Sequence, residues 1–360
     1  MMEFPGFIDV HVHFRDPGLE EAETLASGSE AAARGGFAAA VAMPNTVPAC
    51  DTPDLVRRVA SFKGPVKVFP SAAITVGRLG EKVAPLEDLA AAGAVFFTDD
   101  GANLSSPRVL EEAMRRAKTL GLAVCDHALD PATAGRGVIR DCAFARKAGL
   151  ETIPASAERI AVARDISVCR ITGCRLHIQH ISTAEGVELV REAQKEGLPV
   201  SAEATPHHLL FSCDEISADD ANFKMSPPLG NAEDRSEIRR AVKDGVLMFA
   251  TDHAPHPAAT KSRGFAGSAN GITGLETAVP VTWRVMVEEE GMDPQRWAEA
   301  WWKMPRSLFP ACFGDELASL PSTKISVGSA ARFDVSRSAS LSRNTPYDFM
   351  EFDCWPERSA

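Results

Sequence analysis

What the sequence lacks excludes several classes of protein. No run of 18 apolar residues occurs in the chain, and the opening Met-Met-Glu-Phe-Pro-Gly has neither the charged nor the apolar segment of a secretory leader. Basic tracts are also missing, and 38 basic residues against 49 acidic ones give a net charge of −11. This balance disfavours nucleic acid and anionic membranes as partners. We therefore expect a cytoplasmic protein.

Cysteine pairs are missing as well. The eight cysteines are scattered, and no two of them form a Cys-x-x-Cys pair. Scattered thiols are typical of reduced cytosolic proteins, so we assign them no chemistry. What the chain does have is length and apolar content, because 360 residues of which 45% are hydrophobic can bury one large core. Disorder of the whole chain is thereby excluded.

Strand-like apolar segments alternate with helix-like segments along most of the chain. Residues 21–34, for example, predict a helix that closes at Gly35-Gly36. Eight strand–helix units in a chain of this size indicate an α/β protein with a (β/α)8, TIM-type barrel. An open doubly wound sheet is the alternative, but no Gly-x-Gly-x-x-Gly follows the first strand. The predicted strands begin near residues 7, 37, 66, 94, 122, 175, 199 and 246.

The first predicted strand carries two histidines with an arginine just beyond them. Apolar residues alternate with His11, His13 and Arg15, so on a regular strand both imidazoles point to one face. Imidazole is the commonest metal ligand at neutral pH, yet His-x-His also occurs in strands that bind no metal. This pattern alone leaves metal binding open.

The ends of the other strands carry further polar residues. Because the catalytic groups of a (β/α)8 barrel lie at the carboxyl ends of its strands, we expect these side chains to converge on one rim. Clustered histidine and aspartate mark metal or catalytic sites, whereas burial as plain core would leave several charges without partners. The sequence therefore predicts a metal centre. The strand-end residues are Asn45, Asp99, Asp100, His127, His180, Asp252 and His256.

Strand periodicity separates neighbouring candidates. Residues three apart on a strand face opposite sides, so we expect His180 to face the site and His177 to pack against the helices or lie at the surface. Asp252 is likewise expected to face inward and His253 away from the site. For His207-His208, after the seventh strand, a role beside the metal ligands and a role as ordinary core polar residues both stay open.

Seven short motifs occur in order over residues 7–310: His11-Val-His-Phe-Arg-Asp-Pro-Gly18, Met43-Pro-Asn-Thr46, Thr98-Asp-Asp-Gly101, Ala202-Glu-Ala-Thr-Pro-His-His-Leu209, Lys224-Met-Ser-Pro-Pro-Leu229, Thr251-Asp-His-Ala-Pro-His256 and Gly271-Ile-Thr-Gly-Leu-Glu-Thr277. This set resembles the dihydroorotases of the amidohydrolase superfamily. The resemblance implies a zinc-dependent, reversible interconversion of N-carbamoyl-L-aspartate and L-dihydroorotate in pyrimidine biosynthesis.

The resemblance also implies roles for single residues. Two zinc ions per chain are expected, joined by an aspartate where many related enzymes use a carboxylated lysine, since no lysine lies between Lys82 and Lys118. Of the two adjacent aspartates, the resemblance favours Asp100 as the bridge. Asp252 would complete the first metal's shell and act as the catalytic base. The implied zinc ligands are His11, His13, Asp100, His127, His180 and Asp252, and the implied substrate-binding residues are Arg15, Asn45, Ser226, His256 and Gly271.

Two alternative functions remain open at this stage. Ser226 stands where many dihydroorotases have an asparagine, and cyclic-amide hydrolases of the hydantoinase, dihydropyrimidinase and allantoinase kind are therefore one alternative. A non-catalytic paralogue that supports aspartate transcarbamoylase is the other, although such paralogues lose metal histidines that this chain retains. Arg15 together with Asn45 favours a substrate with a free carboxylate, since a guanidinium offers paired charged donors.

The chain is expected to divide into two parts. Residues 1–310 are predicted to form the barrel and residues 311–360 a C-terminal extension. Only ten residues precede His11, so the β-sandwich accessory domain of relatives is expected to be reduced or absent. Trp297, Trp301 and Trp302 stand at helical spacing, which predicts core packing. Besides a small-molecule substrate, a homodimer and aspartate transcarbamoylase are the partners to consider.

Overall fold

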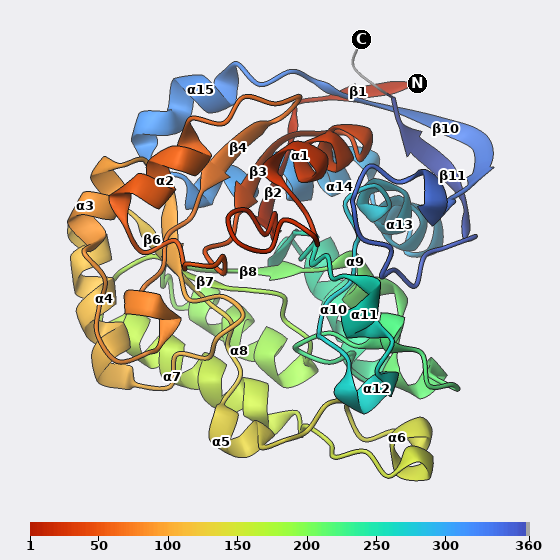
Figure 1. Ribbon diagram of the computed structural model, residues 1–360, viewed down its shortest axis with the longest axis horizontal. Helices are drawn as coiled ribbons and strands as arrows, with labels where there is room; N and C mark the ends of the chain where they lie inside the picture. Colours follow the sequence, from red (N-terminus) through yellow and green to blue (C-terminus); the bar gives the residue numbers. More distant parts are fainter. Residues whose placement is uncertain (358–360) are drawn as a thin grey trace.

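The computed structural model describes residues 1–357 of an α/β protein. Parallel strands lie in the centre and helices surround them (Figure 1). All eight predicted strands are present, three in one parallel sheet and five in another. In sheet order they are β2 (Phe7–Val12), β3 (Phe37–Ala42) and β4 (Lys67–Pro70), then β5 (Phe96–Thr98), β6 (Ala123–Asp126), β7 (Leu176–Ile178), β8 (Val200–Ala204) and β9 (Leu247–Phe249).

Single parallel bridges join the two sheets at both edges. Ala72, just after β4, pairs with Phe97 of β5, and Val12 of β2 pairs with His253, just after β9. The backbone N–H of His13 also donates to the carbonyl of His253 at 2.9 Å. The carboxyl ends of the first and last parallel strands therefore lie next to each other, which brings residues far apart in sequence to one rim.

Most helices follow a strand and cover the sheets. The predicted helix at residues 21–34 begins only at Leu25, because the Thr24 and Ser27 side chains cap the first turn and residues 21–24 form turns before it. The helices of the outer layer are α1 (Leu25–Arg34), α2 (Pro53–Ala60), α3 (Leu86–Ala91), α4 (Pro107–Thr119), α7 (Ser156–Thr172), α8 (Ala184–Lys195), α10 (Ala232–Lys243) and α14 (Pro294–Trp302). Within the described chain, each helix is too short or too polar to span a bilayer.

Short helices occupy the connections. The short α-helices are α5 (Pro131–Ala134), α6 (Ala143–Ala148), α9 (Pro206–Leu210), α11 (Ala258–Lys261), α12 (Gly264–Gly267), α13 (Ala278–Thr282) and α15 (Gly314–Ala318). A π-helix, η4 (Trp283–Glu289), continues α13. The 3-10 turns are η1 (Val76–Arg78), η2 (Cys213–Glu215), η3 (Ala221–Phe223), η5 (Pro305–Leu308), η6 (Ala311–Phe313) and η7 (Val335–Arg337).

The first strand departs from the strict alternation that its sequence predicts. Val10 belongs to a smaller core cluster with Ile8 and residues of the neighbouring strands, whereas Val12 and Phe14 belong to the main cluster. The pairing of β2 with β3 shifts register between positions 9 and 12, and a register shift turns side chains to the other face. The apolar residues that alternate with the histidines therefore pack into two different clusters.

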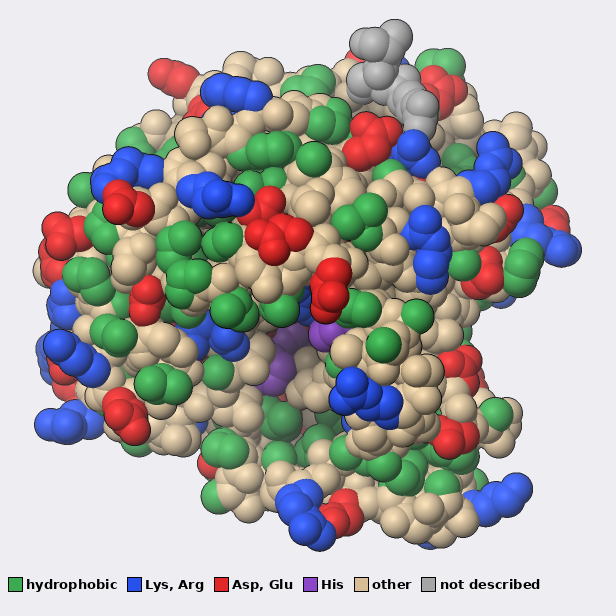
Figure 2. Space-filling model, viewed as in Figure 1, with side chains coloured by type: hydrophobic (Ala, Val, Ile, Leu, Met, Phe, Trp, Pro, Cys, Tyr) green, Lys and Arg blue, Asp and Glu red, His purple; other side chains and the backbone are tan. Residues whose placement is uncertain are grey.

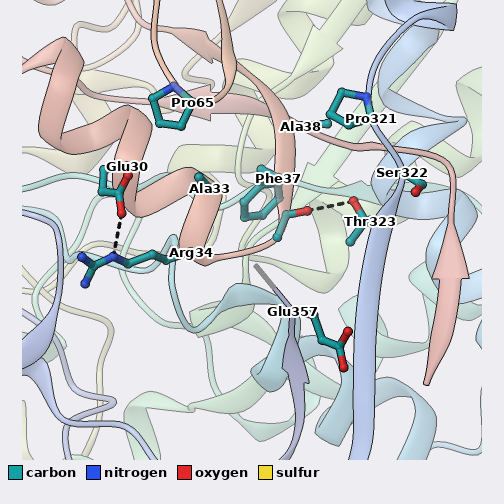
Figure 3. A pocket seen from close by; sticks show the side chains of 11 residues that line it. Glu30, Ala33, Arg34, Phe37, Ala38, Pro65, Pro321, Ser322, Thr323 and Glu357 are labelled. Carbon is teal, nitrogen blue, oxygen red and sulfur yellow. Dashed lines mark hydrogen bonds and ion pairs between the residues drawn. The ribbon is translucent and has the colours of Figure 1, made fainter. Parts of the chain in front are cut away.

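The two ends of the described chain meet in an antiparallel sheet formed by β1 (Met2–Phe4), β10 (Thr323–Arg332) and β11 (Glu351–Pro356). Thr323 ties this sheet to the start of β3, because its hydroxyl donates to the carbonyl of Gly36 at 2.8 Å. A cavity of about 230 Å³ lies beside this contact, lined by residues of α1, β3 and the segment 321–323 (Figure 3). Among described residues it shares no lining residue with the cavity that holds the histidines.

Core packing was predicted for the three tryptophans of α14, and the structure confirms it for two of them. Trp297 and Trp301 are fully buried, and both indole N–H groups donate to the hydroxyl of Thr282 at 3.2 Å. Trp302 is partly exposed, with the guanidinium of Arg306 at 5.1 Å from its ring. These two hydrogen bonds link α14 to α13, because both indoles share the Thr282 hydroxyl as acceptor.

Candidate active site

Histidine side chains lie at the bottom of a hollow in the middle of the face seen in Figure 2. The hollow is a cavity of about 240 Å³ at the carboxyl ends of the parallel strands. Eight of the eleven predicted site residues line it, and three neighbours that the sequence did not single out line it too. The lining residues are His13, Arg15, Asn45, Asp100, His127, His180, Ser226 and Asp252, with Gly101, Asn103 and Asn270 as the additions.

The first group of potential metal ligands joins β2 to the end of β5. Nε2 of His11 lies 3.3 Å from Oδ1 of Asp100, and Nε2 of His13 lies 3.4 Å from Oδ2 of the same carboxylate. All three side chains are buried, and their ligand atoms lie within 4.8 Å of one another. His11 and His13 therefore converge as predicted, in spite of the register shift in β2.

The second group shares the same aspartate. Nδ1 of His127 lies 3.6 Å from Oδ1 of Asp100, and Nε2 of His180 lies 3.5 Å from that oxygen. The two imidazole nitrogens are 2.8 Å apart. Asp100 thus belongs to two sets of three ligands, which is the arrangement that a bridging carboxylate requires.

The neighbouring Asp99 is turned away from these histidines. Its carboxylate accepts hydrogen bonds from the backbone N–H of Thr75 at 3.0 Å and from the Thr75 hydroxyl at 2.5 Å. Burial raises the pKa of Asp99 to about 6, against these hydrogen bonds. Of the two adjacent aspartates, only Asp100 is therefore placed between the histidine groups.

The residues present fit a pair of bound metal ions. Nε2 of His11 and Oδ1 of Asp100 are buried and form no hydrogen bond to any described residue. Buried polar atoms in proteins nearly always have a partner, so these two atoms point to a missing ligand. Imidazole nitrogens combined with carboxylate oxygens form a donor set that zinc accepts, and related divalent ions share the preference.

Asp252 extends the first group. Its Oδ1 lies 3.0 Å from Nε2 of His13 and 3.6 Å from Nε2 of His11. Although burial works the other way, the close contact with the His13 imidazole and the nearby His11 and His180 imidazoles hold the pKa of Asp252 well below its usual value. The carboxylate is therefore ionised at neutral pH and can serve as a ligand or as a proton acceptor.

Three of the site residues have unusual backbone conformations. Arg15, His180 and Asp252 have φ values of 57°, 32° and 48°, a region that residues other than glycine rarely adopt. Such conformations cost free energy and cluster at functional sites, where the surrounding structure holds them. The strand ends here are shaped to aim these side chains at the cavity.

Glu203 stands behind the histidines and was missed by the sequence prediction. Its Oε1 lies 2.5 Å from Nδ1 of His11 and accepts the backbone N–H of His180 at 3.1 Å. Its Oε2 lies 2.9 Å from Nε2 of His177, a residue buried between Glu203 and Ser201. His177 was predicted to pack against the helices or lie at the surface; it is buried, but its ring bonds this carboxylate and the Ser201 hydroxyl. A carboxylate inside the buried strand β8 is the signal that could have revealed Glu203.

Asn45 plays a similar part for His13. Its Oδ1 lies 2.8 Å from Nδ1 of His13, so this nitrogen carries the hydrogen and Nε2 is left with its lone pair toward Asp100 and Asp252. Burial, followed by the charge of Arg15, lowers the pKa of His13. A neutral imidazole with a fixed tautomer is the form that binds metal.

The predicted substrate-binding residues fall into two sets. Arg15 lines the cavity, and its Nε donates to the carbonyl of Pro255 at 3.3 Å. Ser226 also lines the cavity, with Oγ 3.4 Å from Nε2 of His127. His256 and Gly271, in contrast, do not line it.

His256 and Gly271 lie behind the residues that line the cavity. Nε2 of His256 donates to the carbonyl of Asn270 at 2.6 Å, and the same nitrogen is 3.4 Å from Nη2 of Arg15. Burial, followed by the charge of Arg15, lowers the pKa of His256 to about 3, so the ring is neutral. Gly271 has φ of 124°, and a Cβ there would lie 2.6 Å from the Cβ of Ala254. Only glycine fits this turn, which explains its place in the motif.

The remaining histidines belong to neither of the two groups of potential metal ligands. His208 bonds the hydroxyl of Thr205 at 2.8 Å and the carbonyl of Pro227 at 3.2 Å, which makes it a core polar residue. His207 is buried, and its Nε2 has no described partner. His253 faces away from the cavity, as predicted, with Nε2 3.3 Å from the carboxylate of Glu23.

Comparison with known proteins identifies the family of the chain. The family model described as "Dihydro-orotase-like" matches residues 2–186, just over half of the chain. The dihydroorotase of Geobacillus sp. strain WCH70 is 41% identical over 98% of this chain and 84% of its own length. The dihydroorotase of Anaeromyxobacter dehalogenans strain 2CP-1 is 42% identical over 95% of this chain and 81% of its own length.

Solved structures share the fold. The L-hydantoinase (dihydropyrimidinase) of Arthrobacter aurescens matches with a TM-score of 0.85 at 25% identity, over 98% of this chain and 82% of its own. The dihydroorotase of Saccharomyces cerevisiae, solved with 5-fluoroorotic acid, matches with a TM-score of 0.72 at 17% identity, over 99% and 98% of the two chains. The family match and the similarity to relatives over nearly all of this chain agree: the chain belongs to the dihydroorotase-like family of cyclic-amide hydrolases.

Proposed function

We propose that the chain interconverts N-carbamoyl-L-aspartate and L-dihydroorotate, using two metal ions of which zinc is the expected identity. The observation that carries this proposal is the shared position of Asp100 in two sets of three ligands, with the guanidinium of Arg15 in the same cavity. A binuclear centre beside a fixed cation suits a substrate that has both an amide to cleave and a free carboxylate to bind.

In the proposed reaction the ring amide C–N bond of dihydroorotate breaks as water adds its oxygen to the carbonyl carbon, and a proton goes to the leaving nitrogen. When bound, the metal pair would supply an activated water and polarise the amide carbonyl. His11, His13, His127, His180 and Asp100 would hold that pair, with Asp252 completing the first shell.

Asp252 is the group proposed to move the proton. It lines the cavity and is ionised, so it can accept a proton there and pass it to the ring nitrogen. Arg15 is proposed to hold the substrate carboxylate, because its side chain lines the cavity and only its Nε donates to a backbone carbonyl, that of Pro255. Asn45, whose Oδ1 is used on His13, has its amide N–H donors left for the substrate.

A hydantoinase or dihydropyrimidinase activity is the second candidate. The high structural similarity to the Arthrobacter aurescens enzyme and the presence of Ser226 favour it. Identity near 40% to several dihydroorotases, against 25% to that hydantoinase, favours the first proposal. Simple hydantoin and dihydropyrimidine rings also lack the carboxylate that Arg15 is suited to bind.

Parallel assays of the purified, zinc-loaded protein with L-dihydroorotate, hydantoin and dihydrouracil test the proposal. We expect turnover of dihydroorotate in both directions and little or none of the other two rings. Turnover of hydantoin or dihydrouracil without turnover of dihydroorotate would overturn it in favour of the second candidate.

We also propose that the two parallel sheets form one closed (β/α)8 barrel. The bridges Ala72–Phe97 and Val12–His253 support closure at both edges, and helices lie on the outside. The division into residues 1–310 and 311–360 stays a prediction. The antiparallel pairing of β1 with β10 means that any such extension shares a sheet with the first residues of the chain.

A further inference from the structure

Residues 255–271 form a segment that follows β9, includes α11 and α12, and reaches the cavity near its end. Asn270, near its end, lines the cavity, and the carbonyl of Asn270 accepts the hydrogen bond from His256 near its start. Nε2 of His256 in turn lies 3.4 Å from Nη2 of Arg15. The position of segment 255–271 therefore sets the surroundings of the guanidinium that we propose to bind substrate.

Lys261 lies inside this segment and is surrounded by carbonyl groups. Its Nζ donates to the carbonyls of Gly271 at 2.9 Å, Ala269 at 3.0 Å and Lys224 at 3.3 Å. Among the described residues it forms no ion pair with a carboxylate. Burial, followed by the charge of Lys224, lowers the pKa of Lys261 to about 8, which leaves the ammonium charged at neutral pH. Its charge is thus solvated by the backbone of the segment that it holds.

Lys224, from the Lys-Met-Ser-Pro-Pro-Leu motif, binds the same segment. This side chain is only 4% exposed, and its Nζ donates to the carbonyls of Ser268 at 2.7 Å and Ala266 at 2.8 Å. Its own backbone carbonyl accepts the N–H of Gly271 at 3.0 Å. Lysine is rarely buried without a carboxylate partner, and here the buried Lys224 and the half-buried Lys261 both donate to carbonyls of one segment instead.

Asn344 reaches the segment from the C-terminal part of the chain. It is 4% exposed, and its Nδ2 donates to the carbonyls of Ala254 and Gly271, both at 3.0 Å. Its Oδ1 accepts the backbone N–H of His256 at 3.0 Å. Figure 1 shows the blue C-terminal chain running beside α11, in agreement with these contacts. Asn344 therefore ties the start of the segment to its end.

The carbonyl of Gly271 is the point where these contacts converge. It accepts from Nζ of Lys261 and from Nδ2 of Asn344, two donors from parts of the chain more than 80 residues apart. The N–H of Gly271 in addition donates to the carbonyl of Lys224, so a shift at this residue would cost at least one hydrogen bond. A displacement here would carry Asn270 with it and, through the Asn270 carbonyl, His256.

We propose that Lys261 and Asn344 are positioning residues for substrate binding, which act by fixing Gly271 and so placing Asn270 and His256 beside Arg15. Neither residue contacts the metal-binding groups or lines the cavity. Only the expected change in KM for dihydroorotate rests on the proposed function; the positioning of segment 255–271 does not. It also gives Asn344, in the predicted C-terminal extension, a role at the active site.

The variants Lys261→Met and Asn344→Leu remove the donors while keeping much of the side-chain volume. Arg263→Met is the matched control, because Arg263 is an exposed cation in the same segment whose Nε donates only to the carbonyl of Ala259, at 3.1 Å. For each protein, amide hydrogen exchange over residues 266–273 is measured without substrate. The zinc content, KM and kcat for dihydroorotate are measured on the same preparations.

For Lys261→Met and Asn344→Leu we expect faster exchange over residues 266–273 and a KM raised by about 10- to 100-fold, with zinc content kept and kcat changed much less. Arg263→Met is expected to match the unmodified protein in all four quantities. Faster exchange with an unchanged KM would overturn the proposal, and so would unchanged exchange in both variants. The exchange result needs no turnover, so an enzyme that prefers hydantoin would refute the proposed function while leaving this part of the test intact.

Discussion

Nδ1 of His11 lies 2.5 Å from Oε1 of Glu203, and the other oxygen of this carboxylate lies 2.9 Å from Nε2 of His177. Although burial works the other way, the carboxylates of Asp100 and Glu203 hold the pKa of His11 well above its usual value. With Nδ1 bonded to Glu203, Nε2 is the nitrogen left to face Asp100. The imidazole that β2 contributes to the proposed metal centre is thus oriented by a residue on β8.

Glu203→Gln tests this orientation. The amide keeps the shape but can offer only one oxygen, so it cannot accept from His11, His177 and the His180 backbone as the carboxylate does. Groups that orient metal ligands typically contribute about 10- to 100-fold in metal affinity, and we expect a loss of that size for zinc. Competition with a chromophoric chelator measures it. Unchanged affinity would show that His11 needs no such support.

Arg15→Lys tests the proposed carboxylate contact. An ammonium keeps the charge but replaces a planar pair of donors by a point charge. Loss of one charge-assisted hydrogen bond costs about 1.5–3 kcal/mol, so we expect KM for dihydroorotate to rise about 10- to 100-fold with the zinc content unchanged. Steady-state kinetics and metal analysis of the same preparation decide it. A defect in zinc content with a normal KM would instead place Arg15 among the supports of the metal ligands.

Asp252→Asn separates metal binding from proton transfer. The amide can still lie beside His13, but it cannot take up a proton at neutral pH. We expect zinc to be retained and kcat to fall by about 10²- to 10⁴-fold, the range of a general acid–base group. Near-normal turnover would remove Asp252 from that role, and loss of zinc would show that its part as a ligand dominates.

The sequence predicted the strand ends well because parallel strands of one sheet finish at the same edge. His11, His13, Asp100, His127 and Asp252 each follow or end a buried apolar run, and such runs are recognisable without tertiary contacts. The start of α1 was less predictable, because Thr24 rather than the acidic residues before it provides the cap.

Residues whose role depends on distant partners could not be predicted in this way. Glu203 lies within a strand, Lys261 in a loop and Asn344 in the C-terminal segment, and each acts through contacts to residues far away in the sequence. The register shift in β2 is likewise set by pairing with β3 and leaves no mark in the local pattern. His256 and Gly271 were predicted to bind substrate but lie outside the cavity lining, and distance to a cavity is a tertiary property that local sequence does not reveal.

Thr282→Val tests the packing of α14 on α13. Valine has nearly the shape of threonine, but it leaves the buried indole N–H groups of Trp297 and Trp301 without their acceptor. An unsatisfied buried donor costs about 1–3 kcal/mol, so we expect the free energy of unfolding to fall by at least that amount in a urea titration. The matched control is Thr119→Val, an exposed threonine at the end of α4, which should change it by about 0.5 kcal/mol or less. Equal stability of the two variants would show that the indoles find other partners.

Metal counting on three proteins tests the central claim, that Asp100 joins two metal sites. The unmodified protein is predicted to bind two zinc ions per chain, Asp99→Asn to keep both, and Asp100→Ala to lose chiefly the ion held by His127 and His180 together with turnover. Asp99 serves as the control because its carboxylate is occupied by Thr75. Loss of zinc from Asp99→Asn with both ions kept by Asp100→Ala would contradict the claim, and so would a single zinc ion in the unmodified protein at saturation.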